Sequence, residues 1–146
     1  MARRKPLRLA AEDAGDLEVL SAALQDAVAQ LGDFSFDRRR RRFTAVFNRF
    51  RWEDRGFGEA WRTRSAFDVS GVLGVKSKRL KRGAPSAIVS LLSISFEPGE
   101  APGGVLVLAF SGGGEMKLEL ECIDALLADI SEPWPVKSRP AHEDGK

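Results

Sequence analysis

Five consecutive arginines, Arg38, Arg39, Arg40, Arg41 and Arg42, are the residues of this chain with the clearest capacity for chemistry. A guanidinium group stays charged at physiological pH, and its forked N–H donors match phosphates and carboxylates. A second group of cations follows, made up of Lys76, Lys78, Arg79, Lys81 and Arg82. Both groups predict that this part of the chain contacts an anionic partner, either a nucleic acid or an acidic protein.

The two groups belong to a strongly basic central segment. Residues 38–82 contain fifteen Lys and Arg against four Asp and Glu, a balance of +11, whereas the rest of the chain carries eight against seventeen, a balance of −9. Two explanations of the arginine run stay open. It binds anions, with Phe34, Phe36 and Phe43 available to stack on bases, or it is a solvated hairpin turn beside core aromatic residues.

Another pair of arginines lies in residues 48–53, which alternate as a strand does. This alternation places Arg49, Arg51 and Glu53 on one face, from which the two guanidinium groups could hold the carboxylate or phosphate of a small molecule. The alternative is that both arginines pair with neighbouring acids or cover aromatic edges. The first explanation predicts a small enzyme or a ligand-binding protein for an anionic molecule.

The sequence assigns no catalytic residue, cofactor or metal site. Cys122 and His142 are its only cysteine and histidine, and nothing predicts that they meet as a nucleophile and a base. They also leave only carboxylates to complete the ligands of a metal ion. A single thiol excludes an internal disulfide and is typical of reducing compartments. We therefore expect a bacterial cytoplasmic protein and favour a non-enzymatic role over an enzymatic one.

Length and composition predict one domain. The chain has 146 residues, of which 43% are hydrophobic and 30% charged, as in ordinary globular domains. No apolar run is long enough for a signal peptide or a membrane span. We expect disorder in residues 1–5, a single domain over residues 6–132 and a Pro-containing tail over residues 133–146. Trp134 in that tail is a candidate interface anchor, and we favour its docking within the chain over its binding a partner.

Hydrophobic periodicity predicts the elements that precede and carry the arginine run. Leu7 and Leu9 alternate around a polar residue, as in a short strand. A helix capped by Asp13 follows, because apolar residues then recur at spacings of three and four, at Leu17, Leu20, Leu24 and Val28. On both sides of the arginines the period changes to two, which predicts an antiparallel hairpin with the basic run as its turn.

Further strands and a second helix are expected beyond this hairpin. Short strands broken at Gly71 and Gly74 precede a basic loop over residues 76–86, a central strand over residues 87–96 and a hairpin with its turn at residues 111–114. A closing helix that ends at Pro133 is indicated by the spacing of Ile123, Leu126, Leu127 and Ile130.

Strands grouped between two helices favour an α+β fold. The predicted architecture is a single domain with a mainly antiparallel sheet, which could close into a barrel, packed by an N-terminal and a C-terminal helix. About seven strands followed by a C-terminal helix also match the outline of a pleckstrin-homology-like barrel, an architectural analogy that carries no function.

Several segments resemble a known family. They are Leu24-Gln25-Asp26-Ala27-Val28 with Gly32-Asp33, Asn48-Arg49-Phe50-Arg51-Trp52-Glu53, Glu121-Cys122-Ile123, Pro133-Trp134-Pro135 and Ser138-Arg139-Pro140-Ala141-His142-Glu143. In these segments the chain is similar to an alphaproteobacterial family, domain-of-unknown-function family 2948, and the resemblance extends over residues 7–143. It implies a single domain. Because the family has no assigned activity, the resemblance transfers no catalytic residues to this chain.

The uneven distribution of charge along the chain favours one function and leaves two others open. We expect a non-enzymatic binding or adaptor domain that uses a basic edge, formed by Arg38–Arg42 and Lys76–Arg82, against an anionic partner. The second possibility is the small enzyme or ligand-binding protein that uses Arg49 and Arg51. The third is a homo-oligomer in which the basic middle of one copy pairs with the acidic ends of another.

Overall fold

Strands make up most of this chain, because alternating apolar side chains dominate it from Phe34 onward. The computed structural model describes residues 5–54, 60–81 and 83–136. Its helix and strands are β1 (Arg8–Ala11), α1 (Ala14–Ala23), β2 (Val28–Gln30), β3 (Phe34–Asp37), β4 (Arg42–Phe50), β5 (Ala60–Ser70), β6 (Val72–Lys78), β7 (Ile88–Pro98), β8 (Gly104–Phe110), β9 (Glu115–Leu120), β10 (Ala125–Asp129) and β11 (Trp134–Val136). Short 3-10 turns follow β2, β4 and β8, at Leu31–Asp33, Trp52–Asp54 and Ser111–Gly113.

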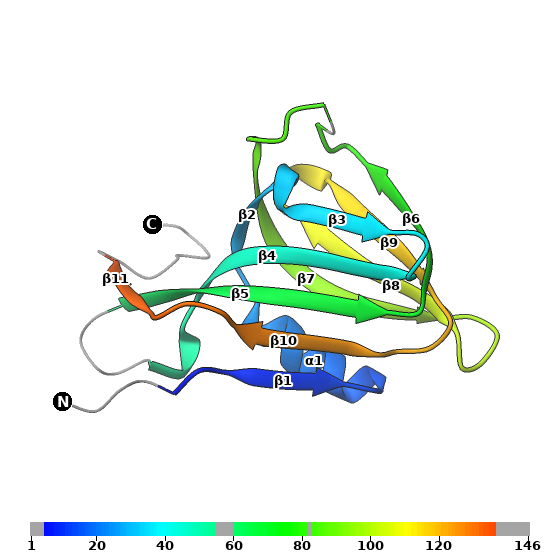
Figure 1. The fold of residues 1–146 in the computed structure, drawn as a ribbon, viewed down its shortest axis with the longest axis horizontal. Helices are drawn as coiled ribbons and strands as arrows, with labels where there is room; N and C mark the ends of the chain where they lie inside the picture. The colour runs from blue at the N-terminus through cyan, green and yellow to red at the C-terminus, as the bar shows by residue number, and fades with distance from the viewer. Residues whose placement is uncertain (1–4, 55–59, 82, 137–146) are drawn as a thin grey trace.

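The eleven strands form one mainly antiparallel sheet in a single domain (Figure 1). They hydrogen-bond in the order β1-β10-β5-β4-β2-β7-β8-β9-β6, while β3 adds to β4 and β11 adds to β5. In Figure 1, β10, β5, β4 and β3 lie in front of β7, β8 and β9, so the sheet folds over into two layers. The described strands β1 and β6 end the order without pairing with each other. The sheet is therefore not closed into a barrel.

Helix α1 packs at one side of this sheet. The carboxylate of Asp13 accepts a hydrogen bond from the N–H of Asp16 at 2.8 Å and so caps the first turn. The helix ends at Ala23, before Val28, because the backbone turns at Asp26 with a φ of 63°. Val28 instead joins β2, which lies at a corner of the sheet and pairs with both β4 and β7.

The predicted closing helix is wrong. Residues 125–129 form β10, which pairs with β1 on one side and with β5 on the other. Its residues on both faces are at least partly buried, as is usual for central strands with covered faces. A continuous apolar run then contains three- and four-residue spacings that resemble a helical stripe. The C-terminal helix on which the analogy with a pleckstrin-homology-like barrel depends is therefore absent from the described residues. The sheet also has eleven strands rather than the predicted seven.

The tail forms part of the sheet as far as it is described. Trp134, Pro135 and Val136 make β11, which pairs antiparallel with the start of β5. The expected disorder of residues 1–5 falls on a segment of which only Lys5 is described, and residues 137–146 also lie outside the described residues. Within the described parts of the chain, no helix has the length and hydropathy that crossing a membrane requires.

The passage from β5 to β6 carries the chain from one layer of the sheet to the other. Gly71 separates the two strands and has a φ of 71°, which L side chains rarely adopt. Its carbonyl accepts from the N–H of Glu121 at 2.9 Å, and the next N–H, of Val72, donates to the carbonyl of Arg41 at 2.9 Å. The beginning of β6 is thereby held against the turn between β3 and β4.

Candidate functional site

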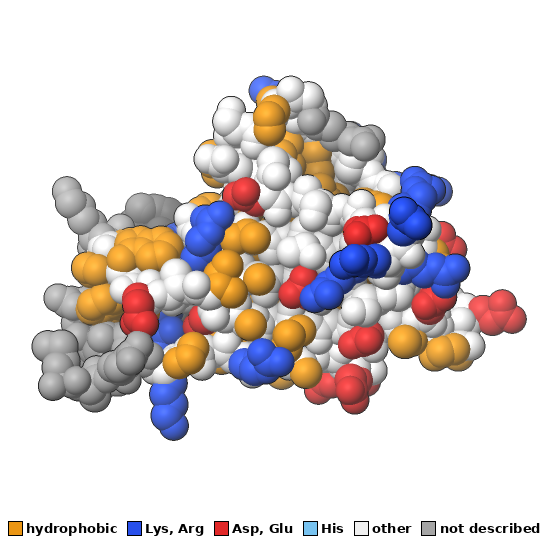
Figure 2. Space-filling model, viewed as in Figure 1, with side chains coloured by type: hydrophobic (Ala, Val, Ile, Leu, Met, Phe, Trp, Pro, Cys, Tyr) orange, Lys and Arg blue, Asp and Glu red, His pale blue; other side chains and the backbone are white. Residues whose placement is uncertain are grey.

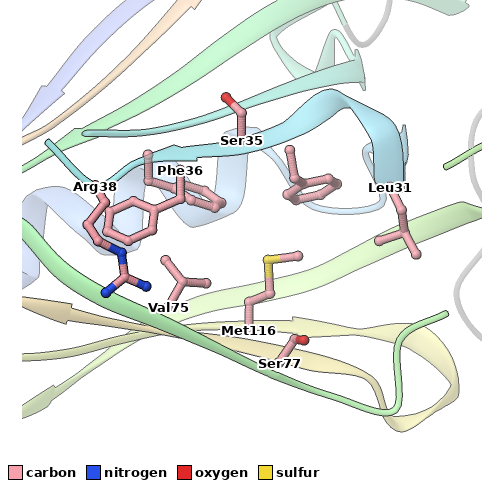
Figure 3. Close-up of a pocket in the computed structure, with 9 residues that line it drawn as sticks. Leu31, Ser35, Phe36, Arg38, Val75, Ser77 and Met116 are labelled. Atoms are coloured by element: carbon pink, nitrogen blue, oxygen red, sulfur yellow. The ribbon is translucent and has the colours of Figure 1, made fainter. Parts of the chain in front are cut away.

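A hollow of about 320 Å³ lies between β3 on one side and β6 and β9 on the other (Figure 3). We call it the β3–β6 slot. Figure 3 shows Val75 and Met116 pointing from β6 and β9 toward β3, with Arg38 at one end and Leu31 at the other. The lining is mostly apolar, and its members are Leu31, Phe34, Ser35, Phe36, Arg38, Phe43, Val75, Ser77 and Met116.

The slot exists because the two strands beside it each have one strand neighbour among the described residues. β3 pairs with β4, and β6 pairs with β9. At the start of β6, the hydrogen bond from the N–H of Val72 to the carbonyl of Arg41 joins the two sides. In Figure 3, β6 runs away from β3 beyond this contact. The slot is therefore an opening between two sheet edges rather than a cavity inside the core.

The aromatic residues of the β3–β4 hairpin divide between the core and the slot. Phe43 is 1% exposed and so has no face free for a nucleic-acid base. The ring of Phe34 packs edge-on against Phe47 and Phe110, with centroids 5.6 and 5.9 Å apart. Phe36 is half-buried, and the guanidinium of Arg38 lies 5.9 Å from its ring centroid. The rings thus face the core and the slot rather than forming an outward platform.

The arginine run forms the turn between β3 and β4, and three of its members lie close to carboxylates. Arg40 is 3.9 Å from Asp37, Arg42 is 3.7 Å from Asp68, and Arg41 pairs with Glu121. Figure 2 shows acidic side chains interspersed with the Lys and Arg side chains over this part of the molecule. All five arginines are exposed. Their positive field is therefore partly offset by acids of the same chain.

The second basic group is split between a strand and a loop. Lys76 and Lys78 lie on β6, although a loop was predicted there, and both are exposed. Arg79 follows the strand with a φ of 58°, and Lys81 is exposed in the loop beyond it; Arg82 is not among the described residues. Because Val75 and Ser77 line the slot, the lysines that alternate with them point to the outer face of β6. Arg38 therefore lies at one end of the slot, and the two lysines lie on the outer face of the strand that borders it.

Arg49 and Arg51 lie elsewhere, at the end of β4, in a buried cluster with side chains of β5 and β10. Arg49 has no solvent exposure, and all five of its N–H donors have acceptors. Nε and Nη2 donate to Asp129 at 2.9 and 3.0 Å, Nη1 and Nη2 donate to Glu53 at 3.0 and 2.6 Å, and Nη1 also donates to the carbonyl of Phe50. Arg51 pairs with Asp54 at 2.7 Å. These contacts favour a structural role for both arginines.

Asp129 is the centre of this cluster. Its carboxylate, whose side chain is 1% exposed, accepts from the backbone N–H of Leu7 and the hydroxyl of Ser65, each at 2.7 Å. It also accepts from Arg49 and, at 3.4 Å, from Arg51. Burial alone would raise the pKa of Asp129, but the hydrogen bonds and the charge of Arg49 outweigh it and hold this pKa below its ordinary value. Burial likewise opposes the charge of Arg49, yet Glu53 and Asp129 raise its pKa.

Acid should remove the stabilisation that the Asp129 carboxylate provides. Because its pKa is depressed in the folded chain, this contribution is complete above the unfolded pKa of about 3.9 and is lost as the pH falls through the folded pKa. Urea unfolding of the wild type and of Asp129→Asn, at several values between about pH 7 and pH 3, measures the effect. The difference between their free energies of unfolding should be largest at neutral pH and shrink below about pH 4. A difference that does not change with pH would contradict this assignment.

Residue-by-residue interpretation missed Asp129 and Ser65. The available signal was an isolated acid within the apolar run of residues 125–130, because a lone carboxylate in a buried strand requires a cationic partner. No group of three or more His, Cys, Asp and Glu side chains within residues 5–54, 60–81 and 83–136 is arranged to hold a metal ion. Cys122 is exposed.

Comparison with known proteins places the chain in a family. The model of the family described as "Protein of unknown function (DUF2948)" matches residues 7–142, which include the slot and the buried cluster. No curated protein and no solved structure matches the chain. The match covers nearly the whole sequence, and the chain belongs to the DUF2948 family.

Proposed function

We propose that the protein is a non-enzymatic binding domain that holds an acidic segment of a partner protein in the β3–β6 slot. The observation that carries this proposal is the combination of an apolar opening with cations at its border. Aromatic and aliphatic side chains line the opening, while Arg38 lies at one end and Lys76 and Lys78 follow one side. A peptide with apolar side chains for the slot and carboxylates for its border fits both properties.

The geometry favours a protein partner over a nucleic acid. Binding to a phosphate backbone draws its free energy from cations that neutralise phosphates and release counterions. Three arginines of the run already lie within 4.0 Å of carboxylates of this chain. Single-stranded nucleic acids also need exposed rings on which bases stack, whereas Phe34 and Phe43 pack into the core. The apolar slot suits the apolar side chains of a peptide better than it suits a nucleic acid.

The geometry also favours binding over catalysis. Among the described residues that line the slot, Arg38 is the one with an ionisable side chain, and a guanidinium group stays protonated near neutral pH. General acid–base catalysis requires a group that can both lose and regain a proton. Arg49, the other candidate for a substrate anion, has acceptors for all of its N–H donors inside the protein.

The homo-oligomer in which basic and acidic parts of different copies pair is less favoured than the binding domain. Arg41 of the basic middle already pairs with Glu121 of the same copy.

Selection of displayed random peptides on the full-length protein tests the proposed function. We expect the selected peptides to be acidic and to contain apolar residues, and their affinity, measured by fluorescence anisotropy, to fall as the salt concentration rises. Ser77→Trp should fill the slot and weaken binding by at least about tenfold. Ser95→Trp is the matched control, because Ser95 is an exposed serine on β7, and it should bind as the wild type does.

Two outcomes would overturn the proposal. One is that no acidic peptide is selected, or that the selected peptides bind equally well to Ser77→Trp. The other is that single-stranded RNA or duplex DNA binds more tightly than every selected peptide at the same salt concentration. The second outcome would return the arginine run to a role in nucleic-acid binding.

A further inference from the structure

We infer that the partner segment binds as an added β-strand along the open edge of β6, with apolar and acidic side chains in alternation. This inference rests on the proposed function and specifies the mode of binding and the pattern of the ligand. Among the described strands, β6 has β9 as its one neighbour. The backbone N–H and C=O groups on its other edge face the slot side and can form a ladder with an extended peptide.

The contact between Val72 and Arg41 limits where the added strand can pair. The N–H of Val72 already donates to the carbonyl of Arg41, so this end of the edge is occupied by the β3–β4 turn. Beyond it, β6 continues to Lys78. The segment from Gly74 to Lys78 remains for pairing, and it defines a ligand of about five residues.

The alternation of β6 determines which side chains of the ligand enter the slot. Val75 and Ser77 line the slot, whereas Lys76 and Lys78 are exposed on the other face. Side chains directly opposite each other on neighbouring strands share a face. Ligand residues opposite Val75 and Ser77 therefore enter the slot against Phe34 and Phe36, and those opposite the lysines stay outside.

The charges on the outer face of β6 and β9 are the reason to expect acidic residues in the ligand. Lys76 lies directly opposite Lys117 of β9, and like charges in this arrangement are unfavourable. Glu115 is the carboxylate near both Lys78 and Lys117, at 3.7 and 3.9 Å. The glutamates of this face lie on β9, so the open edge itself carries lysines. A ligand carboxylate opposite Lys76 supplies the negative charge that this position lacks, and one opposite Lys78 shares that lysine with Glu115.

The lysines also disfavour the binding of strands that are not acidic. Lysine side chains on an open edge discourage pairing with neutral or basic strands, including the same edge of a second copy. An acidic strand gains favourable charge pairs from the same residues. The edge of β6 thus combines a barrier to aggregation with selectivity for a strand that alternates acidic and apolar side chains.

Binding of a defined peptide tests this mode. The probe is a fluorescein-labelled peptide with the core Glu-Ile-Glu-Ile-Glu, and its matched control has the same five residues in the order Glu-Glu-Glu-Ile-Ile. We expect the alternating peptide to bind at least about tenfold more tightly than the control, because only alternation separates the two faces. Two further peptides carry N-methyl groups on alternate amides in the two possible registers. At least one should lose about tenfold in affinity, because methylation removes ladder donors.

Variants of the protein test the role of the lysines. Lys76→Glu should weaken binding of the alternating peptide by about tenfold or more, and a peptide with Lys in place of Glu should then bind this variant better than the wild type. Lys81→Glu is the control for net charge, because Lys81 is an exposed lysine of the loop after β6, and it should change binding little. Hydrogen exchange of the amides from Gly74 to Lys78 should slow when the peptide binds.

The outcomes separate this inference from the proposed function. If selected acidic peptides bind but the alternating order, N-methylation and the protection of β6 amides make no difference, strand addition is wrong and the slot binds its partner in another way. If selected acidic peptides bind and the alternating peptide does not, the predicted pattern is wrong. If no acidic peptide binds at all, both the inference and the proposed function fail.

Discussion

Replacing Asp129 with alanine is expected to lower the free energy of unfolding by about 3–5 kcal/mol. The side chain of Arg49 has no exposure, that of Arg51 has 3%, and both donate to this carboxylate. Removing the carboxylate leaves two buried cations with too little negative charge around them, and it also removes the acceptor of the Leu7 N–H. Urea unfolding followed by circular dichroism measures the loss.

Two further variants, a control and a milder substitution of Asp129, test this expectation. Asp124→Ala is the control, because Asp124 is exposed, and it should change stability by no more than about 0.5 kcal/mol. Asp129→Asn keeps the shape of the side chain and two of its polar atoms, so it can be measured if the alanine variant does not fold. A loss below about 1 kcal/mol for both Asp129 variants would show that the cluster is not a major source of stability.

Replacing Phe47 with alanine is the second change with a large expected effect. Its side chain is fully buried on β4, and its ring packs edge-on against Phe34 with centroids 5.6 Å apart. Truncation of a buried phenylalanine costs about 3–5 kcal/mol, because apolar contacts are lost and a cavity remains. Thermal and urea unfolding should both report this loss.

Phe36→Ala is the informative comparison on the neighbouring strand. Phe36 lines the slot and is half-buried, so its truncation should cost about 1 kcal/mol of stability, which is the usual size for a point mutation. It should instead weaken binding of acidic peptides. A loss of stability for Phe36→Ala as large as that for Phe47→Ala would place Phe36 in the core and argue against the slot as a binding site.

Sequence patterns predicted the local elements where one face of the chain is buried and the other is not. On β4, Phe43, Ala45 and Phe47 are buried while the residues between them are partly exposed, so the alternation that predicted the β3–β4 hairpin was present in the sequence. The same reasoning failed for β10. Its two faces are both covered, so its apolar residues lose the period of two that distinguishes a strand from a helix.

The candidate site was less accessible to sequence analysis than the elements that form it. The cations of β6 are visible in the sequence, but Gly83 and Pro85 in the same segment favour a loop over residues 76–86 and so conceal the alternation of the lysines with Val75 and Ser77. The slot depends on which strand edges lack a neighbour, and pairing between strands distant in sequence decides this. Arg49 and Arg51 were recognised as a pair, but their acceptor Asp129 lies about eighty residues away and no local pattern connects them.

The position of Asp129 has a consequence for how the protein folds. It accepts from Leu7, 122 residues earlier in the chain, and from Arg49, 80 residues earlier. Contacts between such distant residues form slowly, since a long loop must close before the contact can stabilise it. During synthesis the two arginines therefore lack their shared acceptor Asp129 until β10 has left the ribosome. We expect the assembly of β1, β10 and β5 around this carboxylate to be a late and rate-limiting step of folding.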